Sequence, residues 1–382
     1  MKTFKLSEVA RIYSGGTPST KISSYYENGN IAWITPKDLS GYRHKYISSG
    51  QRNITEEGYR KSAAILLPKG SVLFSSRAPI GYVAIAENEL CTNQGFKSFV
   101  CDEKYITSDY LYYFLLCNKE KIAAKANGST FKEISLKAIS DFEIELPTIE
   151  QQKEIVAKVT MLDEKYDFNC KLLKQLYEII DCVYCNCFEE AEYTYAEVEL
   201  GDIVDIVTGG TPSTKNEQYW TNGIYEWFTP SDITSLDNIY IGRTSKKISV
   251  TGLANSGAKL IPANSVIMTS RATIAEVGIN EKEVTTNQGI LSLIPNTDYI
   301  SSIQLYFWIK HNADMIKSIA NGSTFKELYK KDLGKLRIVL SQEKRELFET
   351  KIQHTLNYYR SIVAENEIIK DLRLKLLENM FG

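Results

Sequence analysis

The sequence predicts an α+β fold: two tandem copies of one globular domain of mixed α and β structure, separated and followed by long helices that form an antiparallel coiled coil. Three observations predict it. The motif SGGTPST at 14–20 returns as TGGTPST at 208–214. Short strand-like runs alternate with turn residues inside both copies, and an apolar heptad pattern follows each copy. A chain of 382 residues is long enough for two such domains.

The repeat extends far beyond the opening motif. Applying the offset of 194 residues (208 minus 14) maps WITP at 33–36 onto WFTP at 227–230, and SRA at 76–78 onto SRA at 270–272. The same offset maps TNQG at 92–95 onto 286–289 and NGSTFKE at 127–133 onto 321–327, without a gap. This period is much longer than that of a solenoid, so it indicates a duplicated domain.

The elements of the first copy follow in order. An amphipathic turn (LSEVA) precedes strand-like runs at RIYSG, AWIT, SVLFSSR, YVAIA and FKSFV. SDYLYYFLLCNKEKIAAKA at 108–126 predicts one apolar-faced helix. Thr130-x-x-Glu133 is typical of a capping box and predicts the start of the next short helix. FEIELP, and KLRIVL in the second copy, predict closing strands.

Long helices are predicted between and after the copies, because apolar residues alternate in steps of four and three. The first seam has one polar position, Asn169. Asn366 falls on the second seam, which Thr355 and Arg373 weaken. We predict domains at 1–148 and 191–341, and helices at 149–190 and 342–382. The predicted seam consists of Ile155, Val159, Leu162, Tyr166, Leu173, Leu176, Ile180 and Val183, and of Phe348, Ile352, Tyr359, Ile362, Ile369 and Leu376.

Composition narrows the functional class. The formal net charge is −2, but residues 1–133 hold 18 basic against 12 acidic side chains, and residues 191–327 hold 10 against 15. Bulk charge alone therefore does not predict polyanion binding by the second copy. No apolar run reaches membrane-spanning length and the N-terminus does not resemble a signal peptide, so we expect a cytoplasmic protein.

The seven cysteines are expected to be reduced thiols, since their number is odd and several lie in helix-like sequence. Cys182, Cys185 and Cys187, with Cys170 as a fourth ligand, would be one zinc alternative, but none of the three histidines is close in sequence. Small apolar side chains on a helix are the favoured interpretation, and we predict no metal.

Catalytic motifs do not appear in the sequence. GGTPSTK at 15–21 lacks the second glycine of a P-loop, and neither a dinucleotide-binding glycine motif nor a nucleophile elbow is found. Three scattered histidines do not form a convincing triad. We therefore predict no catalytic residues and no cofactor in this chain.

Binding chemistry is more evident. We call 37–65 in the first copy and 231–259 in the second the variable segments, since they differ most between otherwise similar copies. Both are rich in side chains that read base edges. A solvated surface loop is the alternative. The candidate DNA-binding residues are Thr17, Ser19, Thr20, Lys21, Lys37, Arg43, Lys45, Gln51, Arg52, Asn53, Arg77, Thr211, Ser213, Lys215, Arg243, Lys246, Lys247 and Arg271.

Two alternatives stay open for the residues that the copies share. Arg77 and Arg271 suit either a phosphate contact or a structural ion pair. The GGTPST loops offer N–H groups and hydroxyls to phosphates, or form tight structural turns.

The order of these motifs, the duplication and the intervening helices resemble the specificity (S) subunit of type I restriction-modification systems. LPTIEQQKEIV at 146–156, which opens the first long helix, belongs to the resemblance; the second copy departs from it, with LSQEK at 340–344. The resemblance covers nearly the whole chain.

The resemblance implies that each copy is a target recognition domain that reads one half of a bipartite site in double-stranded DNA. The helices would set the spacing of the half-sites and dock two methyltransferase (M) subunits, which carry S-adenosylmethionine. Restriction (R) subunits would add ATP- and magnesium-dependent translocation and cleavage. This chain would be a non-catalytic DNA-recognition subunit. Two alternatives from the residues alone stay open. One is a protein–protein scaffold that does not bind DNA, which the near-neutral charge favours; the other, weaker one is a nuclease or methyltransferase whose site follows no recognised motif.

Overall fold

The structure is a computed structural model that describes residues 2–42, 44–77, 79–126, 132–188, 196–244, 246–322 and 326–381. The chain divides into two compact units. Unit 1 consists of residues 1–166 and 368–382, and unit 2 of residues 167–367. Each unit therefore holds one copy of the repeat and a stretch of both long helices. No helix among the described residues is long and apolar enough to cross a membrane.

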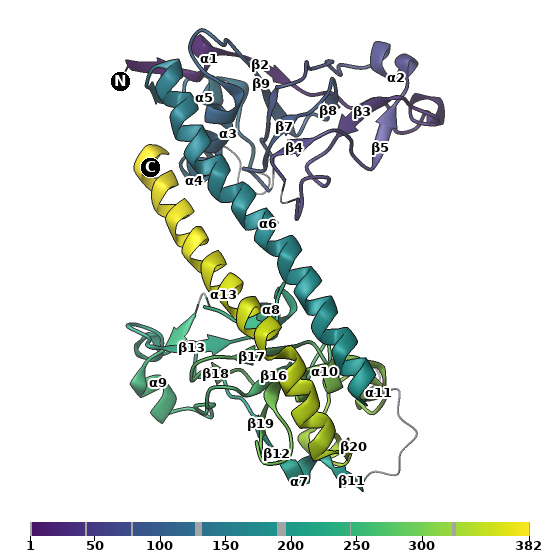
Figure 1. Ribbon diagram of the computed structural model, residues 1–382. Coiled ribbons are helices and arrows are strands. Elements are labelled where there is room, and N and C mark those ends of the chain that lie inside the picture. Colours follow the sequence, from purple (N-terminus) through teal and green to yellow (C-terminus); the bar gives the residue numbers. More distant parts are fainter. Residues whose placement is uncertain are drawn as a thin grey trace. The chain divides into compact units, whose positions relative to one another are not determined.

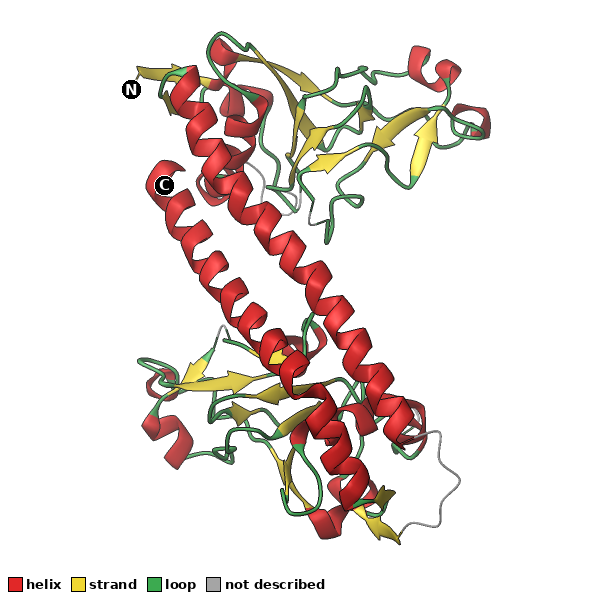
Figure 2. Ribbon diagram, in the orientation of Figure 1, coloured by secondary structure: helices red, strands yellow, loops and turns green. Residues whose placement is uncertain are grey.

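Unit 1 is built around a five-stranded sheet with the strand order β2-β9-β6-β7-β4 (Figures 1 and 2). β4 pairs in parallel with β7, and the other neighbours are antiparallel. A three-stranded sheet β5-β3-β8 and a two-stranded sheet β1-β10 complete the unit. The strands are β1 (Lys2–Lys5), β2 (Ala10–Ser14), β3 (Ile31–Ile34), β4 (Tyr46–Ile47), β5 (Arg52–Ile54), β6 (Val72–Ser75), β7 (Val83–Ala86), β8 (Cys91–Thr92), β9 (Phe96–Cys101) and β10 (Glu143–Leu146).

The helices of unit 1 are short until the chain leaves the globular domain. They are α1 (Leu6–Val9), the 3-10 turn η1 (Ser23–Tyr25), α2 (Glu56–Arg60), α3 (Ser108–Cys117), α4 (Lys119–Ala123), α5 (Leu136–Ser140) and the long α6 (Ile149–Phe188). α3 packs on β6 and β7 and contributes six consecutive buried residues from Tyr110 to Leu115. Phe74 and Phe99 of the sheet lie in the same core. Burial of these large side chains supplies the main driving force for folding.

Unit 2 repeats this topology strand for strand. Its sheets have the orders β12-β19-β16-β17-β14, β15-β13-β18 and β11-β20. The strands are β11 (Ala196–Glu199), β12 (Val204–Thr208), β13 (Tyr225–Phe228), β14 (Tyr240–Ile241), β15 (Lys247–Ile248), β16 (Val266–Thr269), β17 (Val277–Asn280), β18 (Thr285–Thr286), β19 (Ile290–Pro295) and β20 (Arg337–Leu340). The identical order confirms the predicted duplication of one α+β domain.

The helices of unit 2 also follow the first copy, with one addition. They are α7 (Leu200–Ile203), η2 (Glu217–Tyr219), α8 (Pro230–Thr234), α9 (Val250–Ala254), α10 (Ser302–His311), α11 (Ala313–Ser318), α12 (Lys330–Gly334) and the long α13 (Gln342–Phe381). α8 begins with proline at its first position and closes a capping box between Thr229 and Asp232. The matching residues 36–40 of the first copy form turns instead.

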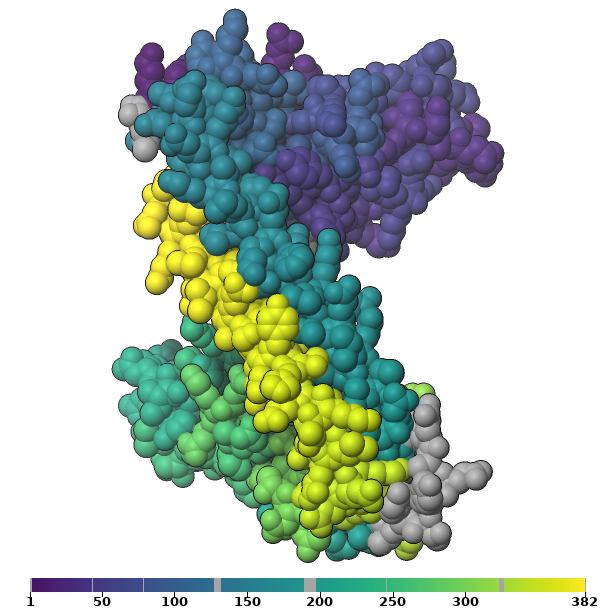
Figure 3. Space-filling view, in the orientation of Figure 1, coloured from purple at the N-terminus to yellow at the C-terminus, as the bar shows by residue number. Residues whose placement is uncertain are grey.

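The two long helices pair inside each unit, with opposite chain directions. In unit 1, Val159 of α6 packs in one core with Leu377 and Phe381 near the end of α13. In unit 2, Ile180 near the end of α6 shares a core with Phe348 and Ile352 near the start of α13. Within each unit, Figure 3 shows atoms of α6 (teal) beside atoms of α13 (yellow). This pairing confirms the antiparallel coiled coil.

Burial along the helices can be compared with the predicted seam. Buried members are Val159, Leu173, Leu176, Ile180, Phe348, Ile352, Tyr359, Ile362 and Ile369, and half-buried members are Ile155, Leu162, Tyr166, Val183 and Leu376. Asn169 and Asn366 are both buried. Arg373, which weakens the apolar pattern, donates from Nε to a carboxylate oxygen of Asp163, and the Tyr113 hydroxyl donates to the other oxygen at 2.8 Å. A polar network therefore replaces apolar contact at this level of unit 1.

Two local predictions were wrong. The helix expected over 108–126 breaks at Asn118, whose side-chain amide donates to the backbone oxygens of Phe114 and Phe381 at 3.1 and 2.8 Å. Thr130, the first residue of the expected capping box, lies outside the described residues. Glu133 is not followed directly by a helix: α5 begins at Leu136, and its N-cap is Ser135, whose hydroxyl accepts the N–H of Ala138 at 3.1 Å.

The first turns of the two long helices differ in sequence but make similar contacts. Gln152 is fully buried; its side chain accepts the Thr107 N–H at 3.0 Å and donates to the Tyr105 oxygen at 2.8 Å. In α13 the guanidinium of Arg345 donates to the Thr297 oxygen at 2.9 Å. Each helix is thereby tied to the loop that precedes α3 or α10, although the second copy lacks the glutamine motif.

Candidate nucleic-acid interface

The GGTPST loop of the first copy rests on the TNQG loop. The Gly16 N–H donates to the Thr92 oxygen at 2.9 Å, and the Trp33 indole N–H donates to the Gly16 oxygen at 3.0 Å. The Thr17 hydroxyl donates to the side-chain oxygen of Gln94. A Cβ on Gly16 would meet the backbone carbonyl carbon of Ala63 at 2.2 Å, so only glycine fits this approach.

The second copy repeats these contacts. The Gly210 N–H donates to the Thr286 oxygen at 2.8 Å, and the Trp227 indole donates to the Gly210 oxygen at 3.0 Å. The Thr211 hydroxyl donates to Gln288. Because the loop N–H and the threonine hydroxyl are used inside each domain, the geometry favours the structural-turn alternative over a phosphate cradle for Gly16, Thr17 and their counterparts.

Arg77 and Arg271 make the same ion pair in their own copies. Arg77 Nε lies 3.0 Å from a carboxylate oxygen of Glu133. Arg271 places both Nε and Nη2 on one oxygen of Glu327, at 2.8 and 2.7 Å. In each copy the arginine and the glutamate also form a β-bridge. The SRA and STFKE motifs are therefore linked through a salt bridge, which favours a structural role for both arginines.

The first copy buries an additional cation beside this ion pair. Lys97 is 5% exposed, and its Nζ lies 3.6 Å from Glu133. Burial lowers the pKa of Lys97 although Glu133 acts in the opposite direction. The equivalent residue of the second copy is Leu291, which is why comparison of the copies did not single out this lysine.

The variable segment of unit 1 is fastened to the domain by Asp38. One Asp38 oxygen accepts the Gln51 N–H at 2.8 Å, and the other accepts the Thr35 N–H and hydroxyl, both at 2.7 Å. The side chains of Lys37, Gln51 and Arg52 remain exposed. The guanidinium carbon of Arg52 lies 4.1 Å from the centroid of the Tyr26 ring, a cation–π contact that orients the guanidinium.

The side chain of Lys45 is largely buried. Its Nζ lies 2.5 Å from Asp109 Oδ1 and 4.7 Å from the centroid of Tyr113, and its side chain is 15% exposed. The Tyr46 hydroxyl donates to the same Asp109 oxygen at 2.9 Å. Burial and this hydrogen bond raise the pKa of Tyr46 to about 12. These contacts anchor the base of the variable segment and make Lys45 less suited to reach DNA than its exposed neighbours.

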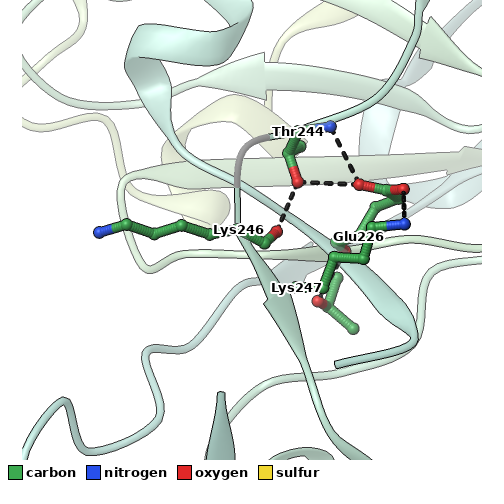
Figure 4. A network of polar contacts seen from close by, with 5 residues as sticks. Glu226, Thr244, Lys246 and Lys247 are labelled. Carbon is green, nitrogen blue, oxygen red and sulfur yellow. Dashed lines mark hydrogen bonds and ion pairs between the residues drawn. The ribbon is translucent and has the colours of Figure 1, made fainter. Parts of the chain in front are cut away.

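The variable segment of unit 2 is fastened by a different carboxylate, Glu226 (Figure 4). Its Oε2 accepts the N–H and the hydroxyl of Thr244, both at 2.9 Å, and its Oε1 lies 2.7 Å from Lys247 Nζ. The Thr244 hydroxyl also reaches the Lys246 oxygen at 2.5 Å. Burial would raise the pKa of Glu226, but the bonds from Lys247 and Thr244 outweigh it and leave this pKa below its ordinary value.

The remaining candidates differ in what surrounds them. Ser19, Thr20 and Lys21, and in the second copy Ser213, Lys215, Arg243 and Lys246, are exposed. The Asn53 side-chain amide donates to the Gly29 oxygen at 3.2 Å. Lys247 is held by Glu226. Arg43 lies outside the described residues. The exposed donors therefore gather in the loop before η1 or η2 and in the variable segment.

One exposed cation occupies the same backbone position in both copies. Arg52 pairs with Trp33 across β3 and β5. Lys246, at the same offset of 194 (246 minus 52), accepts the Trp227 N–H on its backbone oxygen at 3.0 Å. Both copies thus present a long basic side chain opposite the shared tryptophan, Arg52 from β5 and Lys246 from the residue that precedes β15.

Sequence reasoning missed three residues that position this surface: Tyr26, Asp109 and Glu226. Glu226 carried a usable signal, because it stands where the first copy has Ala32 inside an otherwise similar strand. Tyr26 and Asp109 carried none, since a cation–π contact and an ion pair over 64 residues (109 minus 45) depend on the tertiary fold.

Comparison with known proteins places this architecture in a family. Residues 1–178 and 192–372 each match the type I restriction modification DNA specificity domain. The specificity subunit of the type I restriction enzyme MjaIX of Methanocaldococcus jannaschii is 35% identical over 238 residues, covering 57% of this chain and 54% of that one. The chain thus spans about half the length of that relative. The HindI specificity subunit of Haemophilus influenzae is 22% identical over 97% of this chain and 98% of its own.

A solved structure shows the same fold. The crystal structure of a type I restriction-modification system S subunit from M. genitalium superposes with a TM-score of 0.58, at 15% identity, covering 100% of this chain and 96% of that chain. Two matches to the family domain, each covering one globular copy and most of the long helix after it, together span most of the sequence and confirm the resemblance drawn from the motifs. The chain belongs to the family of type I restriction-modification DNA specificity subunits.

Proposed function

We propose that this chain is the non-catalytic subunit that selects the DNA target of a type I restriction-modification complex. Each globular copy reads one half of a bipartite site in double-stranded DNA, and the variable segments carry the side chains that read base edges in the major groove. The observation that carries the proposal is the matched position of Arg52 and Lys246. Two copies of one scaffold present a basic side chain from the same backbone position but surround it differently.

The motifs that the copies share supply a rigid support for this reading. Loop GGTPST, loop TNQG and the Arg–Glu pair use their polar groups within the domain. The variable segments are attached to that support by Asp38 in one copy and by Glu226 in the other. A rigid support lets a few exposed donors be held at defined positions, which direct readout requires.

The net charges of the two copies are the reason why the proposal includes partner subunits. The first copy has an excess of six basic side chains over residues 1–133 (18 against 12), but the second has an excess of five acidic ones over 191–327 (15 against 10). Phosphate neutralisation supplies much of the affinity of DNA-binding proteins. We infer that the second half-site is held together with cationic surface from another subunit.

The long helices offer apolar surface for such subunits. Met161 and Phe168 of α6 are 68% and 60% exposed, and Ile368 and Leu374 of α13 are 59% and 57% exposed. None of these exposed side chains belongs to the predicted seam. We propose that they contact two M subunits, which bring S-adenosylmethionine, and that R subunits, where present, bring ATP and magnesium. None of these cofactors is assigned to this chain.

The decisive experiment is selection of bound sequences from randomised duplex DNA by this chain co-purified with its M subunit. We expect two short fixed half-sites at one constant separation, related in sequence because the domains are similar and not identical because the variable segments differ. Exchange of residues 37–65 with 231–259 should exchange the half-site preferences. A well-folded complex that enriches no sequence would leave the protein–protein scaffold as the function.

Single substitutions test the matched position. Arg52→Ala should relax the base preference in one half-site and Lys246→Ala in the other, each by about 1–3 kcal/mol of discrimination. Lys137→Ala and Lys331→Ala are matched controls, because these lysines are exposed and also equivalent between copies, but lie on α5 and α12. Equal effects of the control pair would contradict base readout at Arg52 and Lys246.

A further inference from the structure

Three side chains of types that can bind metal ions lie close together in unit 2, outside the candidate nucleic-acid interface. The imidazole Nε2 of His311 lies 2.6 Å from Asp181 Oδ1 and 4.0 Å from Cys185 Sγ. One ligand atom from each residue lies within 4.8 Å of the other two. The cluster brings together a carboxylate, a thiol and an imidazole.

The scaffold holds these groups in place. Asp181 and Cys185 are four residues apart on α6, so they lie on one face of the helix one turn apart. His311 is the last residue of α10. The ring of Tyr184, between the two α6 ligands, lies 5.1 Å from the His311 ring and stacks on Phe307 of α10 at 5.6 Å. Aromatic packing thus fixes α10 against α6 at the cluster.

Ligand chemistry selects the kind of ion. Cysteine thiolate, imidazole and carboxylate are the donors that zinc uses in proteins, at about 2.0–2.3 Å from the metal. Three such donors around a tetrahedral ion stand roughly 3.3–3.6 Å apart. The Cys185–His311 distance of 4.0 Å is already close to this range, and the Asp181–His311 contact of 2.6 Å needs to open by less than 1 Å.

The zinc alternative weighed from the sequence, with Cys182, Cys185 and Cys187 as ligands, differs from this cluster, which contains only Cys185 of the three. Cys187 is 4% exposed in the core of unit 2, and the Cys182 sulfur accepts a hydrogen bond from Asn186. Cys185 therefore meets a histidine that lies 126 residues away in the sequence.

Unit 1 provides an internal comparison. The position of His311 corresponds to Cys117 at the offset of 194, and the α6 positions 181 and 185 correspond to Leu374 and Glu378 of α13 at an offset of 193. Leu374 has no donor atom, so unit 1 lacks the three-ligand set. The cluster is a feature of one copy and is not required by the shared fold.

We propose that Asp181, Cys185 and His311 bind one zinc-like divalent cation and join α6 to α10. Three protein ligands leave one position of a tetrahedral ion for water. On binding, the Cys185 thiol loses its proton to solvent, and a sulfur–metal bond replaces the S–H bond with no change of oxidation state. This inference does not rest on the proposed DNA recognition and stands or falls by itself.

Cobalt(II) titration of the full chain under reducing conditions tests the site, since a cobalt–thiolate bond gives a near-ultraviolet charge-transfer band. The result expected is one equivalent per chain, with the band lost in Cys185→Ser. Zinc affinity, measured against a chromophoric chelator, should fall at least about tenfold in Asp181→Asn and in His311→Asn. Cys182→Ser, on the same helix and outside the cluster, should bind like the unsubstituted chain.

The effect of zinc on thermal stability provides a second measurement beside the cobalt titration. Zinc should raise the Tm of the unsubstituted chain and of Cys182→Ser, and at the same zinc concentration should raise that of Asp181→Asn by clearly less. Circular dichroism of the metal-free variants checks that each is folded. Persistence of the cobalt band in Cys185→Ser, equal loss in Cys182→Ser, or the absence of saturable binding at one equivalent would each overturn the proposal.

Discussion

Asn169 of α6 and Asn366 of α13 bond to each other within the paired helices of unit 2. The Asn169 side-chain amide donates to the Asn366 side-chain oxygen at 2.9 Å and to a Glu365 carboxylate oxygen at 2.8 Å. Both asparagines are buried, at 1% and 5% exposure. A polar pair of this kind is satisfied in only one alignment of the two helices, so it selects the register of the coil at some expense of stability.

This pair predicts a difference between single and double substitution. Asn169→Leu leaves the Asn366 amide buried with fewer partners, and we expect the free energy of unfolding to fall by about 1–3 kcal/mol. The double variant Asn169→Leu with Asn366→Leu should be clearly more stable than the single variant, because the seam becomes continuous and apolar. Urea unfolding measures both. Additive losses in the double variant would contradict the pairing.

The close approach of Gly210 in the TGGTPST loop to Gly257 predicts that one added methyl group lowers the free energy of unfolding. A Cβ on Gly210 would meet the backbone carbonyl carbon of Gly257 at 2.2 Å, whereas a Cβ on Gly257 would meet no atom within 4 Å. Gly210→Ala should lower the free energy of unfolding by at least about 1–3 kcal/mol. Gly257→Ala is the matched control and should be close to neutral. Equal midpoints of the two variants in thermal unfolding would show that the loop has room.

If Arg271 serves the fold through its salt bridge with Glu327, its loss should lower the free energy of unfolding but leave the salt dependence of DNA binding unchanged. Because both side chains are partly exposed, at 46% and 30%, Arg271→Ala and Glu327→Ala should each cost at most about 1 kcal/mol, and their double variant little more. With the selected DNA, the slope of affinity against salt should stay unchanged. If Arg271→Ala alone lowered that slope by about one, Arg271 would be a phosphate contact.

The Glu226 network predicts an acid-sensitive contribution to unit 2. The pKa of Glu226 lies below its ordinary value in the folded chain, so the carboxylate stabilises the fold fully above the unfolded pKa of about 4.3. That stabilisation is lost as pH falls through the lower, folded pKa. Glu226→Gln should cost about 1–2 kcal/mol at pH 7.

Urea unfolding between pH 7 and pH 3 measures how the contribution of the Glu226 carboxylate to stability depends on pH. The difference between the unsubstituted chain and Glu226→Gln should shrink as pH falls below about 4.3. Glu283→Gln changes an exposed carboxylate in the same unit and serves as the control. A difference that stays constant over this range would mean that the Glu226 charge does not hold the variable segment.

Much of the fold was predictable because its signals are local or repeated. Strand-like runs bounded by turn residues marked β2, β6, β7, β9 and β10, and the heptads marked both long helices. The break at Asn118 was not predictable, since its amide is held by the Phe381 oxygen from the far end of the chain. Glu133 was mistaken for part of a helix cap for the same reason: its partner, Arg77, is 56 residues away.

The candidate nucleic-acid interface was also predictable only in part. The shared motifs were visible in the sequence, but not that GGTPST rests on TNQG or that Arg77 is paired with Glu133. Lys45 and Arg52 looked alike as basic residues of one variable segment. Their surroundings separate them: Asp109 draws Lys45 inward, and Tyr26 supports an exposed Arg52.

By itself, the sequence determined that this protein is a duplicated α+β domain with a helix after each copy, because repetition and periodicity are properties of the linear chain. It also contained the motifs that point to the specificity-subunit family. Only the tertiary structure decided which polar groups are used internally, that Asn169 meets Asn366, and that Cys185 meets His311. The physical reason is that such contacts join residues far apart in the sequence, 197 positions for the asparagine pair and 126 for Cys185 with His311, and folding alone brings them within bonding distance.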